Sequence, residues 1–405
     1  MNRWSALALL LAIAGALALR VPKLDTRPLH NDEAVNAVKV SELWQHGRYV
    51  YSPDEYHGPA LHYATLPFLW LSGAPNSDEL DDATLRLAPV AFGVGLILLL
   101  LLFSDGLGRQ AVGWAAIFIA VSPAMVFYSR YFIHEMLLVF FTALTLGAGW
   151  RYVQARVSRR AFSLSLQRGE GRGEGWEVRE SLEAQESQRP HQPSLSVPLP
   201  VEERGKSTAV GSGRGSSFWA VMIGAGLGLM LTTKETFVIT LAAMILAGIA
   251  TAWWTMREIR SPNFRNPKED RDPKSETQFG EPAGERRSSP VREPGQLDFG
   301  HQNSFGFRML ALWNWRHAAL AFGTAFIIWL LLFSSFFTNF VGLLDSVRTY
   351  LPWLKRAGGH SPHIHPWHFY LQRLAWFHSV KGPAWSEGLV LVLATVGVVV
   401  SLGWK

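Results

Sequence analysis

Long uncharged apolar runs alternate along the chain with stretches that concentrate its charged and polar residues. A helix needs about 20 mostly apolar residues to cross the ~30 Å hydrocarbon core of a bilayer. Eight runs approach that length, which predicts an all-α integral membrane protein with about eight transmembrane helices. They cover roughly residues 4–21, 87–104, 111–128, 132–150, 218–233, 236–254, 318–340 and 388–404.

For two apolar segments, the first run and a ninth segment, the sequence must be examined further to decide whether they span the membrane. The first run follows Arg3, as in a signal peptide, but Leu19-Arg20-Val21-Pro22-Lys23 is not a small-x-small cleavage site, so we expect a retained span. A ninth apolar segment, residues 57–72, is short and contains two His and two Pro. It is more typical of an interfacial helix than of a span.

The distribution of Lys and Arg among the loops predicts the orientation of the chain in the membrane. With eight spans and a cytoplasmic N-terminus, loops 153–217 and 255–317 face the cytoplasm, and together they carry more than half of the 38 Lys and Arg residues. This agrees with the positive-inside tendency, which a ninth span would violate. We therefore expect the outer loops 20–86 and 341–387 on the outer face of a cytoplasmic (inner) membrane, with interfacial helices in the first of them.

The same loops divide the chain into segments. Both cytoplasmic loops are rich in Arg, Glu, Ser, Gly and Pro and lack apolar periodicity, which predicts disorder. The expected order is an N-terminal membrane module 1–152, a low-complexity loop 153–217, a transmembrane pair 218–254, a low-complexity loop 255–317, and helices in 318–405 that flank the second outer loop.

Composition excludes several classes of protein. Among 405 residues, 48% are hydrophobic and 17% charged, and there is no Cys, so thiol chemistry, Fe–S clusters and Cys zinc sites are ruled out. The net charge of +6 would suit nucleic acid only as a basic patch on a folded domain. Here the basic residues are interspersed with nearly as many acids, so we expect no nucleic-acid partner.

The first outer loop contains an acidic pair next to the membrane. Asn31 precedes Ala34, Ala37, Val40 and Trp44, which are spaced as on one helix face before Gly47. This predicts a short amphipathic helix capped by Asn31, with Asp32 and Glu33 in its first turn. The pair either complements the helix dipole or provides a general base with a raised pKa, and the residues alone leave both open.

Two further groups of charge lie at predicted outer ends of spans. Arg130, His134 and Glu135 follow the third span, where a plain ion pair and a phosphate-binding guanidinium are both plausible. Lys234 lies in Thr232-Thr233-Lys234-Glu235, and its ammonium would either bind a phosphate or extend to the membrane surface.

The second outer loop is rich in histidine. Four His fall within residues 360–368, but Pro362 and Pro366 impose an extended chain and no carboxylate is close. Metal binding is therefore the weaker interpretation, and we predict interfacial contact through His365 and the aromatic residues around Trp367.

In this order and on one face, these motifs resemble the GT-C class of polytopic glycosyltransferases, which includes protein O-mannosyltransferases and the lipid A aminoarabinose transferase. The stretch HNDEAVNAVKVSELWQHGRYVYSPDEYHGP is most similar to a bacterial and archaeal family labelled flippase activity-associated protein. The resemblance covers roughly residues 4–152 and 218–404. Relatives usually continue through more spans, so we also consider a truncated or inactive copy.

The resemblance assigns roles to residues. It implies Asp32 and Glu33 as catalytic carboxylates with Asp32 as the base, and Ser129-Arg130-Tyr131 as a mannosyltransferase motif that ends in Glu135 instead of Asp. Arg130 and Lys234 would contact donor phosphate. His57, His134, His365 and Trp367 are further candidates for substrate or interface contact.

The implied function is transfer of a hexosyl or pentosyl group from a polyprenyl-phosphate donor to a lipid, glycan or protein acceptor on the outer face. No cofactor is assigned, and a requirement for a divalent metal is left open. The alternatives are a transporter or flippase component for lipid-linked sugars and a non-catalytic scaffold. Neither internal repeats nor midplane charges, the marks of a transporter, are found in the sequence.

Overall fold

The computed structural model describes residues 3–53, 57–73, 80–170, 212–260, 314–357, 365–366, 368–378 and 384–403. The regular secondary structure in this part of the chain is helical apart from one antiparallel pair of two-residue strands, so the all-α class is confirmed. The elements are α1 (Arg3–Arg20), α2 (Asn31–His46), α3 (Ala60–Ser72), α4 (Asp82–Leu99), η2 (Leu100–Phe103), α5 (Ser104–Leu107), α6 (Arg109–Val121), α7 (Pro123–Ser129), α8 (Glu135–Glu170), α10 (Ser212–Leu231), α11 (Phe237–Arg260), α13 (Trp315–Phe333), α14 (Val341–Arg348), α15 (Tyr350–Ala357), α16 (Phe369–Ala375), β1 (Phe377–His378), β2 (Ala384–Trp385) and α17 (Gly388–Gly403).

The chain forms two compact units. One comprises Met1–Thr240 and Asn314–Lys405, and the candidate site lies within it. The other, Leu241–Trp313, is described only for the greater part of α11.

Each of the eight apolar runs corresponds to helical structure: the run 87–104 to the consecutive α4, η2 and α5, the run 111–128 to a bent pair of helices, and each other run to one helix. By length and composition, four described helices can cross a membrane, and α6 with α7, bent by 60°, makes a fifth candidate. Helices α1, α10 and α17 are shorter apolar helices. The chain is therefore an integral membrane protein, and the count of eight spans stays a prediction.

Several predicted boundaries are wrong. The run expected over 318–340 stops at Phe333, because Ser335, Phe336 and Phe337 have φ values of 48°, 53° and 71°, which no right-handed helix contains. The low-complexity loops expected from residues 153 and 255 both begin as helix, since α8 runs to Glu170 and α11 to Arg260. Residues 171–211 and 261–313 of those loops lie outside the described residues, and the loops also end as helix, since α10 begins at Ser212 and α13 at Trp315.

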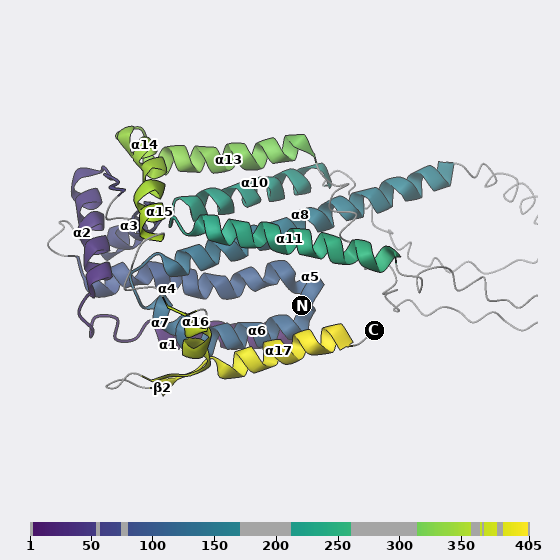
Figure 1. Ribbon diagram of the computed structural model, residues 1–405, viewed down its shortest axis with the longest axis horizontal. Coiled ribbons are helices and arrows are strands. Elements are labelled where there is room, and N and C mark those ends of the chain that lie inside the picture. Colours follow the sequence, from purple (N-terminus) through teal and green to yellow (C-terminus); the bar gives the residue numbers. More distant parts are fainter. Residues whose placement is uncertain are drawn as a thin grey trace, which may run out of the picture. The chain divides into compact units, whose positions relative to one another are not determined.

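Helix α10 lies beside α13 and α8 (Figure 1), and its glycines let it pack closely against both. Gly224 and Gly228 face α13, where an added Cβ on Gly228 would lie 2.9 Å from Ala325 Cα. Gly226 faces α8, where a Cβ would overlap the Thr145 hydroxyl. Close approach of helices over small residues is a common way to pack spans in lipid.

The bend between α6 and α7 is held by a buried arginine. Ser122 breaks the helix before Pro123, and its hydroxyl accepts a hydrogen bond from Met125 N–H. The Arg20 guanidinium, at the end of α1, donates to the Ala120 and Ile119 carbonyls, at 2.7 and 2.8 Å, and to Ser129 Oγ at 3.1 Å. It thereby satisfies carbonyls that the break leaves without helical partners, and it fixes the turn that follows α7.

Candidate active site

Helix α2 presents a polar stripe to the interior. Its N-cap is His30, not the expected Asn31, because the Glu33 carboxylate accepts the His30 backbone N–H at 3.1 Å. It ends at Gly47 in the left-handed conformation (φ 62°), as expected. The face predicted from Ala34, Ala37, Val40 and Trp44 is partly wrong, because the buried residues are Glu33, Asn36, Lys39, Val40 and Leu43.

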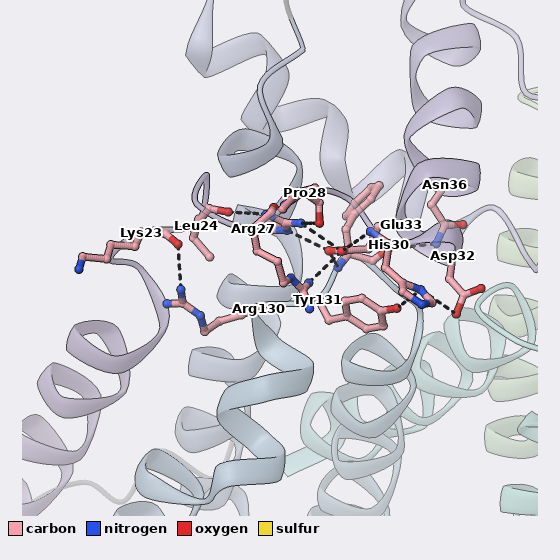
Figure 2. Close-up of polar contacts among 12 residues, drawn as sticks. Lys23, Leu24, Arg27, Pro28, His30, Asp32, Glu33, Asn36, Arg130 and Tyr131 are labelled. Atoms are coloured by element: carbon pink, nitrogen blue, oxygen red, sulfur yellow. Dashed lines mark hydrogen bonds and ion pairs between the residues drawn. The ribbon is translucent and has the colours of Figure 1, made fainter. Parts of the chain in front are cut away.

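Glu33 is buried completely, and Figure 2 shows its carboxylate at the centre of a network of donors. Arg86 Nε lies 2.9 Å from Oε1 and Arg86 Nη2 3.1 Å from Oε2, and Arg27 Nη2 donates to Oε2 at 2.8 Å. Burial alone would raise the pKa of Glu33, but the hydrogen bonds from Arg86, Phe132 N–H and His30 N–H and the charge of Arg27 bring it below its ordinary value. The raised pKa expected of a general base therefore does not apply to Glu33.

The same stripe joins two sequence motifs. Phe132 N–H donates to Glu33 Oε1 at 2.9 Å, and the Phe132 carbonyl accepts from Asn36 Nδ2 at 3.0 Å. One peptide segment is thus held on both sides by residues one helical turn apart. This contact places the turn from Arg130 to His134 against α2.

Asp32 points away from this network. Its side chain is 71% exposed, and its Oδ2 lies 4.0 Å from His30 Nδ1 (Figure 2). The Tyr131 hydroxyl lies 2.6 Å from the same His30 nitrogen, and burial and the nearby charge of Asp32 raise the pKa of Tyr131 to about 12. Asp32 is therefore accessible while Glu33 is not.

A hollow of about 180 Å³ lies beside Asp32. It unites side chains from α2, the turn before α3, the start of α8 and the turn between α10 and α11. The lining residues are Asp32, Val35, Asn36, His57, Ile133, His134, Glu135 and Lys234. Five of the nine candidates from the sequence therefore meet in one place.

Lys234 and Glu135 form an ion pair at the edge of this hollow. Their Nζ and Oε1 atoms are 2.5 Å apart, with the lysine 19% and the glutamate 36% exposed. The pair joins the first residue of α8 to the turn after α10. Both side chains remain within reach of a ligand.

Backbone contacts bring the segment before α3 to the hollow. Gly58 N–H donates to Thr233 O at 3.1 Å and Ala60 N–H to Thr232 O at 2.9 Å, so the segment uses carbonyls at the end of α10. A Cβ on Gly58 would overlap the Thr232 carbonyl. His57, which precedes this glycine, has its Nδ1 2.7 Å from Glu235 Oε2.

Two buried histidines lie behind His57. The ring of His134 is 5.2 Å from that of His57 and 5.5 Å from that of His62. His134 Nε2 contacts Gly58 O at 3.0 Å. Burial lowers the pKa of His134 well below its ordinary value and that of His62 to about 3. Both rings therefore stay neutral near physiological pH.

Arg130 and His365 are not among the residues that line the hollow. Arg130 donates to the carbonyls of Leu19, Arg20, Pro22 and Lys23, at 2.8–3.2 Å, and so caps the end of α1. Figure 2 shows the contact with Lys23. His365 stacks on Phe369, with ring centroids 3.8 Å apart. Trp367 lies outside the described residues. A role for these three in binding stays a prediction.

The described residues contain no group of three or more His, Asp or Glu able to hold a metal ion. Sequence reasoning missed Arg86, Asn36 and Glu235 as parts of the site. Arg86 could have been found in the sequence, because an ionisable residue at the start of an apolar helix needs a partner. That partner, Glu33, is 53 residues away in the chain, so the sequence did not show it.

Residues 60–168 match the family model of the dolichyl-phosphate-mannose-protein mannosyltransferases. This match confirms the resemblance to the GT-C class over the segment that contains Arg86, His134 and Glu135. Asp32 and Lys234 lie outside it.

One solved structure similar to this chain is the S. cerevisiae protein O-mannosyltransferase Pmt1-Pmt2 complex bound to the sugar donor. The identity is 14% and the TM-score 0.45, over 85% of this chain and 34% of that chain. The chain thus spans about a third of the length of that protein. Curated proteins gave no match.

Proposed function

We propose that this protein is a GT-C glycosyltransferase that moves a sugar from a polyprenyl-phosphate donor to a hydroxyl acceptor on the outer face of the membrane. The observation that supports this most is the hollow in which Asp32, Glu135 and Lys234 meet. The family-model match over residues 60–168 agrees with a lipid-phosphate sugar as donor.

The proposed reaction is a single displacement. Asp32 accepts the proton of the acceptor hydroxyl, whose oxygen forms the new bond to the anomeric carbon as the bond to the phosphate oxygen breaks. The polyprenyl phosphate leaves with the electron pair, and the Lys234 ammonium stabilises the charge that develops on it. Glu135 keeps that ammonium in position through their ion pair, and Glu33 holds the helix that carries Asp32.

The geometry favours Asp32 over Glu33 as the base. Asp32 is exposed to the hollow, whereas the Glu33 oxygens are occupied by four side-chain and backbone neighbours. A carboxylate with that many donors holds its negative charge tightly and accepts a proton poorly.

The test is donor turnover by the full chain in proteoliposomes, measured as release of polyprenyl phosphate from polyprenyl-phosphate mannose with a hydroxyl acceptor or water. Asp32→Asn is expected to lower turnover at least 100-fold, because general-base catalysis contributes about 10²–10⁴-fold. Asp25→Asn, an exposed acid in the same loop, is the matched control and should leave turnover unchanged.

Full turnover by the Asp32→Asn variant would rule out Asp32 as the general base. Translocation of the lipid-linked sugar with no new glycoside, in the wild-type protein, would instead support the transporter interpretation.

A further inference from the structure

The hollow offers fewer cations than the sequence predicted. Of the two expected phosphate contacts, Lys234 lines it and shares its charge with Glu135, whereas Arg130 donates to four carbonyls at the end of α1. Among the described lining residues, the remaining side chains that can carry a positive charge are His57 and His134. Because His134 is buried and stays neutral, His57 is the candidate.

His57 is held in one orientation by a buried carboxylate. Its Nδ1 lies 2.7 Å from Glu235 Oε2, and Tyr51 O–H donates to the other oxygen, Glu235 Oε1, at 3.2 Å. The Glu235 side chain is 10% exposed and that of His57 45%. An imidazole that donates through Nδ1 to a carboxylate has its tautomer and ring direction set, with Nε2 on the opposite side.

The state of Glu235 fits this orientation. Burial alone would raise its pKa, but the hydrogen bonds from His57 and Tyr51 and the charge of His57 lower it below its ordinary value. Glu235 is therefore a carboxylate that accepts from Nδ1–H. In the described part of the chain, no residue forms a hydrogen bond with His57 Nε2.

The backbone keeps His57 beside Lys234. Gly58 follows the histidine and pairs with Thr233, which precedes the lysine, through an N–H···O contact of 3.1 Å. The two side chains thus come from segments joined by a backbone hydrogen bond, and both line the hollow.

We propose that His57, oriented by Glu235, is the second phosphate-binding group of this hollow. When its ring carries a second proton, Nε2–H donates to one non-bridging oxygen of a lipid phosphodiester, and Lys234 contacts the other. This inference rests on the proposed function, because the lipid-linked donor is what brings a phosphodiester to the site.

The proposal predicts that donor binding depends on pH. Glu235 and Tyr51 face His57 on one side, His134 on another, and Lys234, Glu135 and Asp32 share the hollow. Lysine and carboxylate side chains do not ordinarily titrate between about pH 6 and 8.5, whereas histidine does. His134 and His62 stay neutral there because burial lowers their pKa.

The experiment measures binding of polyprenyl-phosphate mannose to the full chain in detergent, by thermophoresis, at about pH 6 and pH 8.5. Its phosphodiester keeps a single negative charge over this range, so a change in affinity belongs to the protein. Wild type should bind about tenfold more tightly at the lower pH, the effect of one charge-assisted hydrogen bond. His57→Gln and Glu235→Gln should lose this gain. Lys234→Gln should weaken binding at both pH values and keep the ratio, and His46→Gln, an exposed histidine on α2, should behave as wild type.

The outcomes separate this inference from the function on which it rests. If wild type binds the lipid and His57→Gln keeps both its affinity and its pH ratio, His57 does not bind the phosphate, and the glycosyltransferase proposal still stands. If wild type binds no lipid at either pH, the proposal that a polyprenyl-phosphate sugar is the donor is wrong. A matching size-exclusion profile and melting temperature show that each variant is folded.

Discussion

Arg86 and Glu33 form an ion pair that is closed to solvent, with Arg86 Nε 2.9 Å from Glu33 Oε1 and side chains 1% and 0% exposed. Arg86 lies in the first turns of α4, and Glu33 in the first turn of α2. The Arg86 guanidinium also donates to the Arg27 carbonyl at 2.8 Å. One arginine thereby ties an apolar helix to the loop and helix that carry Asp32.

Removing one partner of this pair should destabilise the protein strongly. Glu33→Gln leaves a buried guanidinium without its counter-charge, a change that costs about 3–5 kcal/mol in comparable buried pairs. We expect a marked fall in melting temperature, measured by differential scanning fluorimetry in detergent. Asp32→Asn should melt like wild type. A Glu33→Gln protein of wild-type stability that lacks only turnover would instead make Glu33 a catalytic residue.

Stability should fall in acid. The pKa of Glu33 is lower in the folded protein than its ordinary value of 4.5, so its contribution is complete above that ordinary value. The contribution is lost as pH falls through the lower, folded pKa. The pKa of Glu235 is shifted in the same direction. Melting temperatures from pH 7 downward should therefore drop below about pH 4.5. The fall in melting temperature should be shallower in Glu33→Gln than in wild type, and in Asp25→Asn it should equal that of wild type. Equal dependence of melting temperature on pH in all three proteins would contradict the contribution assigned to Glu33.

Arg130 should act on the fold more than on the donor. Its guanidinium donates to four carbonyls between Leu19 and Lys23. Lysine cannot reproduce that fork, so Arg130→Lys should cost about 1–3 kcal/mol of stability and leave donor affinity of the folded protein within about twofold. A stable Arg130→Lys protein that fails to bind polyprenyl-phosphate mannose would restore the phosphate role that the family resemblance implies.

Gly58 should not tolerate a side chain. A Cβ there would overlap the Thr232 carbonyl, so Gly58→Ala must move the segment that carries His57 away from the end of α10. We expect lower stability and a loss of affinity for the donor that exceeds any loss of secondary structure. The ratio of donor affinities at about pH 6 and pH 8.5 should also be lost. Gly15→Ala is the matched control, because nothing lies within 4 Å of a Cβ at that position of α1. In an interior helix position alanine is neutral or stabilising.

Part of this site was visible in the sequence because local pattern determines it. The helix α2 with Asp32 and Glu33 in its first turn, and its end at Gly47, follow from helical spacing and a terminal glycine, although the cap is His30 and not the predicted Asn31. Glu135 and Lys234 stood out as charges at the predicted outer ends of spans, and the structure brings them together at 2.5 Å. Which acid of the pair is buried did not follow, because one residue of rotation on a helix reverses the environments of Asp32 and Glu33.

The sequence by itself determined the apolar helices, because burial in lipid requires long uncharged runs, and the positions of the charged turns between them. Tertiary structure alone decided the pairing of those charges. Arg86 with Glu33, Arg130 with the end of α1, and His57 with Glu235 are separated by 53, about 110 and 178 residues. Ion pairs and hydrogen bonds act over a few ångströms, so a local pattern shows that a charge needs a partner, and only the packing of the helices shows which one it has.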